Sequence, residues 1–477
     1  MKTYQWIPLL ILLASVIKPL FAENLNSDVA LLKRALSDLH PGYNRYISTK
    51  DLESLWTTLS IKSQKTNPLA FYTDVSQLLA TLRCEHTKAE LPPNLEANKK
   101  ARFMPFTFKL FDNKMYISES SIGLPKGTEI KTIDGIPIED ILNKIRSHVA
   151  VDGYTTHTID PKIEQDFDLL GSNFEVFYAN AVLGLDDFPE SFTIQYHEKS
   201  KSSLVTEKFR AISFDEWLNL LDKPYRLDFK DAVSVKYQGS TAILTVDTFV
   251  NYRQPVNAEE LFAEIFYDIH NKSVDKLIVD LRNNGGGSDD AQNALLRHLY
   301  NRPFKVNSAA YVTATNLKDW RGTLNTWSDN IFDIDVSQFK KTDLGYQLPS
   351  HLLGVNYQLQ TPSENHFKGN IILLTSANNS SASAALLAHL GQQENVRLVG
   401  SKTGGNQGGT TATIMAFLKL PKSGVTVRIP LIRNQYNIEN SEDGMGTNPD
   451  IEVVTTIEDW LENIDPQMRK AIEVIHQ

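Results

Sequence analysis

The 477-residue sequence has a single cysteine, Cys84, and no long run of apolar residues. One cysteine cannot form an intrachain disulfide, so folding must rest on the burial of apolar side chains. The one apolar stretch near the N-terminus is interrupted by Lys18 and Pro19 and is too short to cross a bilayer. Residues 1–22 combine a basic start, an apolar stretch and the small residue Ala22, which predicts a secretory signal peptide. We therefore expect a secreted or periplasmic protein without a membrane span after signal removal; an uncleaved anchor is the alternative.

The chain is also poor in positive charge. The sequence has 48 Lys and Arg residues and 57 Asp and Glu residues, which gives a formal net charge of −9. This balance argues against nucleic acid or an anionic membrane as the main partner, because both favour basic surfaces. No His, Cys and Glu cluster has the spacing of a zinc site, and the Gly-x-Ser-x-Gly motif of α/β-hydrolases is absent. We expect neither a metal nor a cofactor.

Apolar periodicity divides the mature chain into three parts. Residues 23–92 carry three amphipathic helical patterns and predict an N-terminal helical unit that ends near Pro92 and Pro93. Residues 93–232 alternate with period two in several places and predict a β-rich domain. From residue 233 to 477, short apolar runs alternate with helical patterns, which favours a parallel sheet covered by helices. We interpret residues 304–368, which are polar and long, as an insertion or lid.

Three successive glycines, Gly285 to Gly287, follow the apolar strand at residues 277–281. Without Cβ atoms, such a turn can direct several N–H groups into one space and bind an anion. A nucleotide phosphate fits poorly, because Asp289 and Asp290 would place negative charge at the start of the next helix. The oxyanion of acyl transfer needs only one or two donors. A plain strand–turn–helix joint is the alternative.

A second strand, at residues 370–375, is followed by a turn that contains Ser380, Ser381 and Ser383. We expect the helix after it to run from about residue 384 to 390. The free N–H groups at a helix start favour an alkoxide or a developing oxyanion nearby. Capping of the helix by one of these serines is the alternative.

Together, four segments resemble the catalytic domain of the carboxyl-terminal processing and tricorn-type serine peptidases. They are residues 279–287 (VDLRNNGGG), 381–384 (SASA), 399–405 (VGSKTGG) and 446–453 (GTNPDIEV). The resemblance covers roughly residues 237–454. It implies an α/β, ClpP/crotonase-like catalytic domain. In residues 124–146 we expect a strand, an Asp-Gly turn and a helix from residue 138 to about 146. Residues 124–137 (LPKGTEIKTIDGIP) resemble the central part of a divergent PDZ-like peptide-binding domain within the β-rich region, and a generic strand, turn and helix is the alternative.

The resemblance implies a nucleophile and an oxyanion hole. Ser383 matches the nucleophile, and the backbone N–H groups of Gly286 and Ala384 match the oxyanion hole. The processing branch activates its serine with a lysine, but Asn406 stands at that position, and an amide is not a general base at neutral pH. Lys402 lies earlier in the motif, at a position that the family does not use for catalysis.

The tricorn-type branch uses a histidine instead, and residues 82–87 (LRCEHT) resemble the segment that carries it. This implies His86 as the general base. Glu85 stands where the tricorn-type proteins have a bridging serine. The acid that orients the base precedes the 446–453 segment, where Asp443 aligns best and Glu442 is a close second.

The leading hypothesis is an exported serine peptidase that cleaves peptide or protein substrates through an acyl-enzyme. The alternative is an exported, non-catalytic peptide- or ligand-binding protein on the same fold, and an esterase or amidase is a third candidate. A thiol nucleophile at Cys84 is disfavoured, because a spacing of two residues places it on a different face from His86.

Overall fold

The computed structural model describes residues 24–92, 102–165, 167–168, 171–197, 203–221, 226–313, 317–334 and 336–477. The predicted signal peptide lies outside these residues. Within the described ranges, no helix has the length and apolar character that a membrane span requires.

A six-stranded sheet forms the centre of the C-terminal half. Its strand order is β10-β11-β12-β17-β18-β21, and all neighbours are parallel except the edge pair of β10 and β11. The strands are β10 (Val233–Gln238), β11 (Thr241–Val246), β12 (Lys276–Asp280), β17 (Asn370–Thr375), β18 (Val396–Gly400) and β21 (Ile451–Glu452). The predicted parallel, helix-covered α/β sheet is therefore confirmed.

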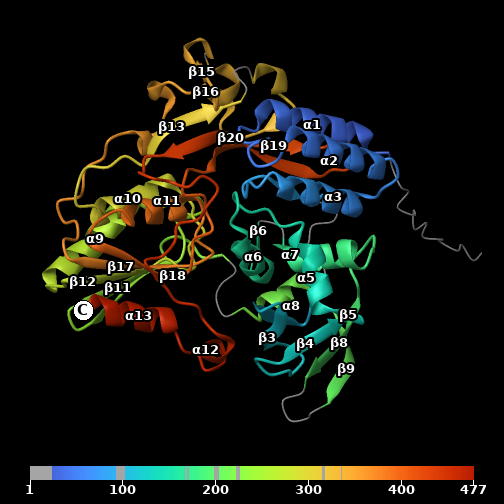
Figure 1. The fold of residues 1–477 in the computed structure, drawn as a ribbon, viewed down its shortest axis with the longest axis horizontal. Coiled ribbons are helices and arrows are strands. Elements are labelled where there is room, and N and C mark those ends of the chain that lie inside the picture. The colour runs from blue at the N-terminus through green and yellow to red at the C-terminus, as the bar shows by residue number, and fades with distance from the viewer. Residues whose placement is uncertain are drawn as a thin grey trace, which may run out of the picture.

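Alternate residues of these strands enter two separate cores, as the period of a strand requires. Leu277 and Val279 pack against the three helices on one face, α9 (Ala258–Asn271), α10 (Asp289–Leu299) and α11 (Ser381–Leu390). Ile278 faces the other side, where Ala471 and Ile475 of α13 (Pro466–Ile475) cover it. Figure 1 shows these helices on the two faces of the sheet.

A second sheet is built on the long hairpin of β19 (Thr411–Lys419) and β20 (Thr426–Tyr436). It has the order β14-β19-β20-β13-β16-β15, and β1 also pairs with β20. The added strands are β1 (Lys88–Glu90), β13 (Asn307–Val312), β14 (Leu324–Asn325), β15 (Lys340–Thr342) and β16 (Gly345–Gln347). The interpretation of residues 304–368 as an insertion or lid needs correction, because β13 to β16 lie in this range and are strands of this sheet.

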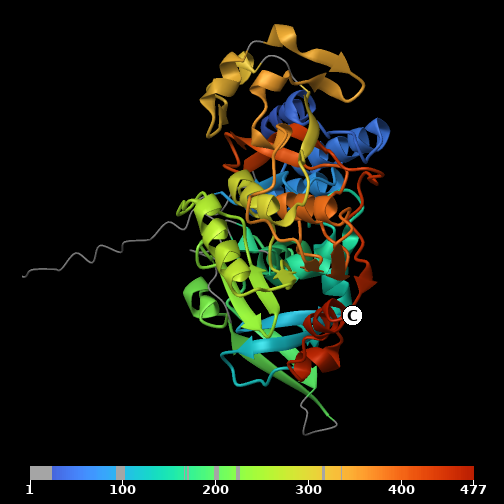
Figure 2. The same cartoon turned by 90° about the vertical axis from the view of Figure 1, so that its left-hand side faces the viewer.

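The N-terminal helices pack against this second sheet. The three predicted helices are present as α1 (Asn26–Leu39), α2 (Thr49–Lys62) and α3 (Pro68–Thr81). Ser48 and Asn67 cap the last two by accepting hydrogen bonds from backbone N–H groups of the first turn. The two views agree that these helices, drawn in blue, lie beside the red strands of the hairpin (Figures 1 and 2).

The third sheet belongs to the predicted β-rich region and has the order β2-β3-β4-β8-β9, with β5 paired to β4. Its strands are β2 (Phe106–Phe111), β3 (Lys114–Ser120), β4 (Glu129–Ile133), β5 (Ile136–Pro137), β8 (Ser191–His197) and β9 (Leu204–Arg210). The helices around it are α5 (Ile138–Arg146), α6 (Ile159–Gln165), α7 (Asn173–Phe177), a π-helix at Tyr178–Val182 and α8 (Phe214–Leu218). The strand, Asp-Gly turn and helix expected within residues 124–146 are present, while the PDZ-like assignment stays a prediction.

Two contacts connect parts of the chain that are far apart in the sequence. The short helix α12 (Ile457–Leu461), which follows the central sheet, contacts the β-rich region: Lys126 Nζ donates to the carbonyl oxygen of Trp460 over 2.8 Å. In α1, the buried carboxylate of Asp28 accepts hydrogen bonds of 2.8 Å from both the N–H and the Oγ of Ser423, in the turn between β19 and β20. This second contact fastens the helical unit to the hairpin.

We expect Asp28→Ala to lower the free energy of unfolding by about 3 kcal/mol, because it leaves buried donors without their charged acceptor. The control is Asp38→Ala on the same helix, whose carboxylate is 42% exposed and pairs with Arg34 along the helix surface. Urea denaturation of both variants measures the effect. Equal stability of the two variants would contradict it.

Candidate active site

The two turns singled out in the sequence meet because their strands are neighbours. Strands β12 and β17 pair in parallel, so their carboxyl ends lie at the same edge of the sheet. The glycine turn follows β12, and the serine turn follows β17. A cavity of about 1080 Å³ opens over this edge, and its wall includes Gly285 to Gly287, Ser380 and Ser381. The cavity is large enough for a peptide side chain and its flanking backbone.

Ser381 occupies a special place in this wall. Helix α11 begins at Ser381, three residues before the predicted start, and the backbone of Ser381 has φ +50°, which is uncommon for a residue with a side chain. Such strain is retained where the surroundings fix it and is frequent at functional sites. Gly286 lies against it: a Cβ there would come within 2.8 Å of the Ser381 Cβ. A side chain at residue 286 would therefore displace Ser381.

Ser383, in contrast, is fully buried within α11 and does not line the cavity. Its Oγ accepts a hydrogen bond of 3.1 Å from Nδ2 of Asn379, which is also fully buried. A hydroxyl in this position cannot reach a substrate in the cavity. The placement of Ser383 does not fit the role of nucleophile, and the early start of α11 is the reason.

The two backbone N–H groups predicted for the oxyanion hole already donate hydrogen bonds to other groups of the chain. Gly286 N–H donates to Asn284 Oδ1 over 2.9 Å, and Ala384 N–H donates to the Ser380 carbonyl oxygen over 3.2 Å. Ala382, next to Ser381, and Gly287 also line the cavity. Within the described part of the chain, the N–H groups of these two residues have no hydrogen-bond acceptor. They fit an oxyanion hole better than the predicted pair.

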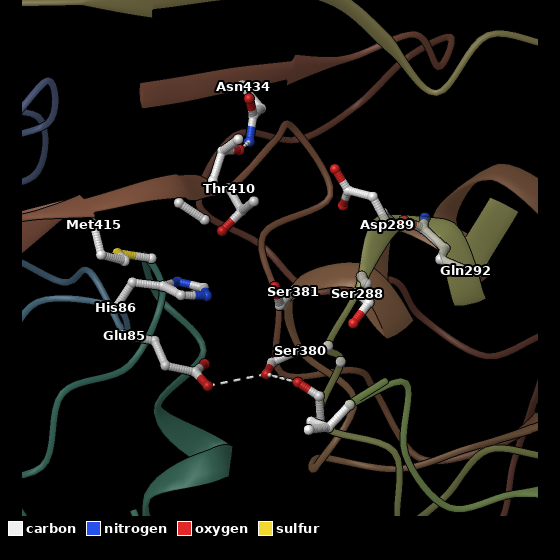
Figure 3. A pocket seen from close by; sticks show the side chains of 18 of the residues that line it. Glu85, His86, Ser288, Asp289, Gln292, Ser380, Ser381, Thr410, Met415 and Asn434 are labelled. Atoms are coloured by element: carbon white, nitrogen blue, oxygen red, sulfur yellow. Dashed lines mark hydrogen bonds between the residues drawn. The ribbon is translucent and has the colours of Figure 1, made fainter. Parts of the chain in front are cut away.

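His86 lines the same cavity, and Figure 3 shows its imidazole on the side that faces Ser381. Its carbonyl oxygen accepts a 3.0 Å hydrogen bond from Arg428 Nε. Burial lowers the pKa of His86 to about 4, although the neighbouring Glu85 carboxylate opposes this shift. The imidazole is therefore neutral at neutral pH, as a general base must be.

Neither predicted acid lies beside His86. Asp443 is bound by the Arg45 guanidinium and by Asn406 Nδ2, the latter over 3.0 Å, and it does not line the cavity. Glu442 is exposed and also lies outside the cavity wall. Both placements disagree with a role in orienting the imidazole. Nδ1 of His86 is buried and has no hydrogen-bond partner among the described residues.

Glu85 is the acidic group at the cavity beside His86. Its Oε1 lies 2.9 Å from Lys162 Nζ and 2.9 Å from Ser380 Oγ, which is also 2.9 Å from the Gly285 carbonyl oxygen (Figure 3). Burial disfavours the ionised carboxylate, but the Lys162 ammonium holds the pKa of Glu85 well below its usual value. Glu85 thus joins the histidine segment to the serine turn and to α6.

Two members of this cluster are not among the residues predicted from the sequence. Lys162 stands in α6, and the buried Asp152 accepts a 2.9 Å hydrogen bond from the Glu85 N–H. Burial, aided by the charge of Glu85, raises the pKa of Asp152 to about 7. Both residues come from the β-rich region without a local motif, so no sequence signal points to them.

Cys84 is buried against the hairpin, with its Sγ 3.8 Å from the Thr411 carbonyl oxygen. Burial raises the pKa of this thiol to about 12, so it is not a thiolate at neutral pH. In the described ranges, no group of three or more His, Cys, Asp or Glu residues could hold a metal ion.

Comparison with known proteins agrees with this architecture. Residues 240–453 match the model of peptidase family S41. Mature CPAF complexed with lactacystin has a TM-score of 0.64 at 14% identity, over 95% of this chain and 97% of that chain. A CPAF serine-to-alanine mutant has a TM-score of 0.64 at 15% identity, over 95% of this chain and 96% of that chain. No curated protein matches the sequence. At this identity the solved structures establish the shared fold, and the family match establishes that the domain at residues 240–453 belongs to peptidase family S41, as its motifs predict.

Proposed function

We propose that the protein is an exported serine peptidase in which Ser381 is the nucleophile and His86 the general base. The observation that carries this proposal is the position of Ser381 in the wall of the cavity that His86 also lines, at φ +50° and at the first residue of α11. Activated serines are recognised by such geometry rather than by sequence spacing. The proposal that the protein is exported rests on the sequence of residues 1–22 alone.

In the proposed reaction, Ser381 Oγ attacks the carbonyl carbon of a peptide bond while a ring nitrogen of His86 takes the hydroxyl proton. The N–H groups of Ala382 and Gly287 stabilise the negative oxygen of the tetrahedral intermediate. The peptide bond breaks as the leaving amine takes the proton from His86. Water then attacks the ester on Ser381 while His86 takes a proton from it, and the ester bond breaks as His86 returns this proton to Ser381 Oγ and the acid is released.

A non-catalytic peptide-binding protein is the second candidate. It is favoured by the buried Nδ1 of His86, which has no hydrogen-bond partner among the described residues and no acid beside it at Asp443 or Glu442. A base without an orienting partner is expected to be less effective. The two candidates differ in whether Ser381 is reactive.

Covalent labelling with a fluorophosphonate probe separates them. We expect the wild type to be labelled and Ser381→Ala to lose labelling completely, because the attacking oxygen is gone. Ser383→Ala is the matched control two residues away, and we expect it to keep labelling. Gel fluorescence after equal exposure gives the measurement.

Circular dichroism should show that both serine variants are folded. We expect Ser383→Ala to lose about 1 kcal/mol of stability, since its buried hydrogen bond with Asn379 is removed. Labelling that persists in Ser381→Ala, or that disappears only in Ser383→Ala, would reject the proposed nucleophile. A folded wild type that never reacts would favour the binding protein.

The pH dependence of kcat/KM tests the base. His86 must be neutral to accept a proton, so activity should be lost as pH falls through its pKa of about 4. At pH 5, about nine-tenths of the pH 7 value should remain, because one pH unit above a pKa leaves most of the group neutral. An acid limb near pH 6.5 would contradict the account. Asp152→Asn is the control. The pKa of Asp152 is raised to about 7, so its titration falls in the same pH range, and the variant removes it.

A further inference from the structure

Helix α10 forms part of the cavity wall. It carries a carboxylate that takes no part in the proposed reaction. Asp289, the first residue of α10, lines the cavity, and Figure 3 shows its carboxylate directed into the open space. The amide of Asn356 donates a hydrogen bond to it. The next residue, Asp290, is held separately by Asn251 Nδ2 over 2.8 Å.

No cation balances Asp289 among the residues that the structure describes. Burial and the neighbouring charge of Asp290 raise its pKa, and only the Asn356 amide acts in the opposite direction. The cations of the cavity wall are elsewhere: Lys88, Lys162 and Arg428 act on His86. The cavity therefore has a cationic side around the proposed base and an acidic side at α10.

Besides Oε2 of Glu85 and Nδ1 of His86, three buried polar atoms on the cavity wall lack partners within the described ranges. They are Nε2 of Gln292, one turn after Asp289 on α10, Oδ1 of Asn307 at the start of β13, and Oγ1 of Thr410. Gln292 is 1% exposed and Asn307 3% exposed. Buried polar groups are almost always satisfied, so unpartnered ones around a cavity indicate positions where a ligand completes the hydrogen bonding.

The acidic side is held in place by a chain of amides. Gln360 Nε2 donates to Asn293 Oδ1 over 2.7 Å, and Asn293 Nδ2 donates to Asn356 Oδ1 over 2.5 Å. Asn356 in turn contacts Asp289. Such a network fixes the carboxylate before a ligand arrives, which reduces the entropy lost on binding.

We propose that Asp289, with Asn307 and Thr410, forms a subsite for a basic side chain, arginine or lysine, of the peptide substrate. The carboxylate and the two free oxygens accept hydrogen bonds, and a guanidinium or ammonium supplies several N–H donors and the opposite charge. The inference deepens the proposed function, because it assigns the substrate class of the same site.

The test measures binding to Ser381→Ala, so that it does not depend on turnover. The probes are fluorescent peptides with blocked termini that carry one arginine at each position in turn, and the same peptides with the neutral isostere citrulline. At one position we expect arginine to bind at least about tenfold more tightly, the effect of one desolvated, charge-assisted pair. Adding Asp289→Asn should abolish this difference. Anisotropy titration gives the dissociation constants.

The matched control is Glu264→Gln, which removes one negative charge from the exposed face of α9, outside the cavity. We expect it to keep the arginine preference. Equal binding of arginine and citrulline peptides at every position, or a preference that survives Asp289→Asn, would overturn the subsite. If Asp289→Asn does not fold by circular dichroism, Asp289→Ser replaces it.

The outcome is independent of the proposed reaction. A folded wild type that fluorophosphonate never labels, together with a retained arginine preference, would reject the peptidase and keep the subsite. Labelling of Ser381 without any arginine preference would reject the subsite and keep the peptidase.

Discussion

The site depends on the side chain of one buried asparagine. Nδ2 of Asn379 lies 2.6 Å from the carbonyl oxygen of Leu281 and 3.1 Å from that of Asn284, and it also reaches Ser383 Oγ. Its Oδ1 accepts a 2.7 Å hydrogen bond from the Ser376 N–H. A single amide thus joins the turn after β12 to the turn after β17. Parallel pairing of the strands brings the two turns to one edge, and Asn379 fixes their relative position.

The second requirement is that the N-terminal unit returns to the hairpin. Strand β1 pairs with β20, and Arg428 of β20 binds the carbonyl oxygen of His86. This places the imidazole over an edge that belongs to a sheet far along the chain. A third contact is the ion pair between Glu85 and Lys162 of α6. Residues from three parts of the chain therefore share one cavity.

The proposed catalytic residues and the Asp289 carboxylate lie on different sides of the cavity. Burial, aided by the nearby cations, lowers the pKa of His86 and keeps it neutral, while the Asp289 carboxylate lies on the α10 side of the cavity. A peptide that spans the cavity would meet a nucleophile and a charge-selective surface in fixed geometry. Such an arrangement positions the substrate before reaction, which is how enzymes convert binding into rate.

The sequence predicted the elements better than their ends. The apolar runs at residues 277–281 and 370–375 gave correct strands, because apolar periodicity reports burial directly. The start of α11 was placed too late, since small polar and apolar residues alternate there and a serine at φ +50° has no sequence signature. The resemblance pointed to Ser383, whereas Ser381 is the serine that lines the cavity.

Contacts between residues far apart in the chain could not be predicted from the sequence either. Asp443 aligned with the family's acid, but it is bound by Arg45, 398 residues away along the chain, and no local pattern encodes that pairing. Lys162 and Asp152 reached the site through the packing of the β-rich region. The motifs identified the family and the two turns, whereas the choice among neighbouring side chains required coordinates.

Tandem mass spectrometry of the fluorophosphonate adduct identifies which serine reacts. We expect the modified residue to be Ser381, and we expect His86→Ala, which leaves this serine in place, to reduce the yield strongly. An adduct on Ser383 or Ser380, or a yield that does not depend on His86, would contradict it.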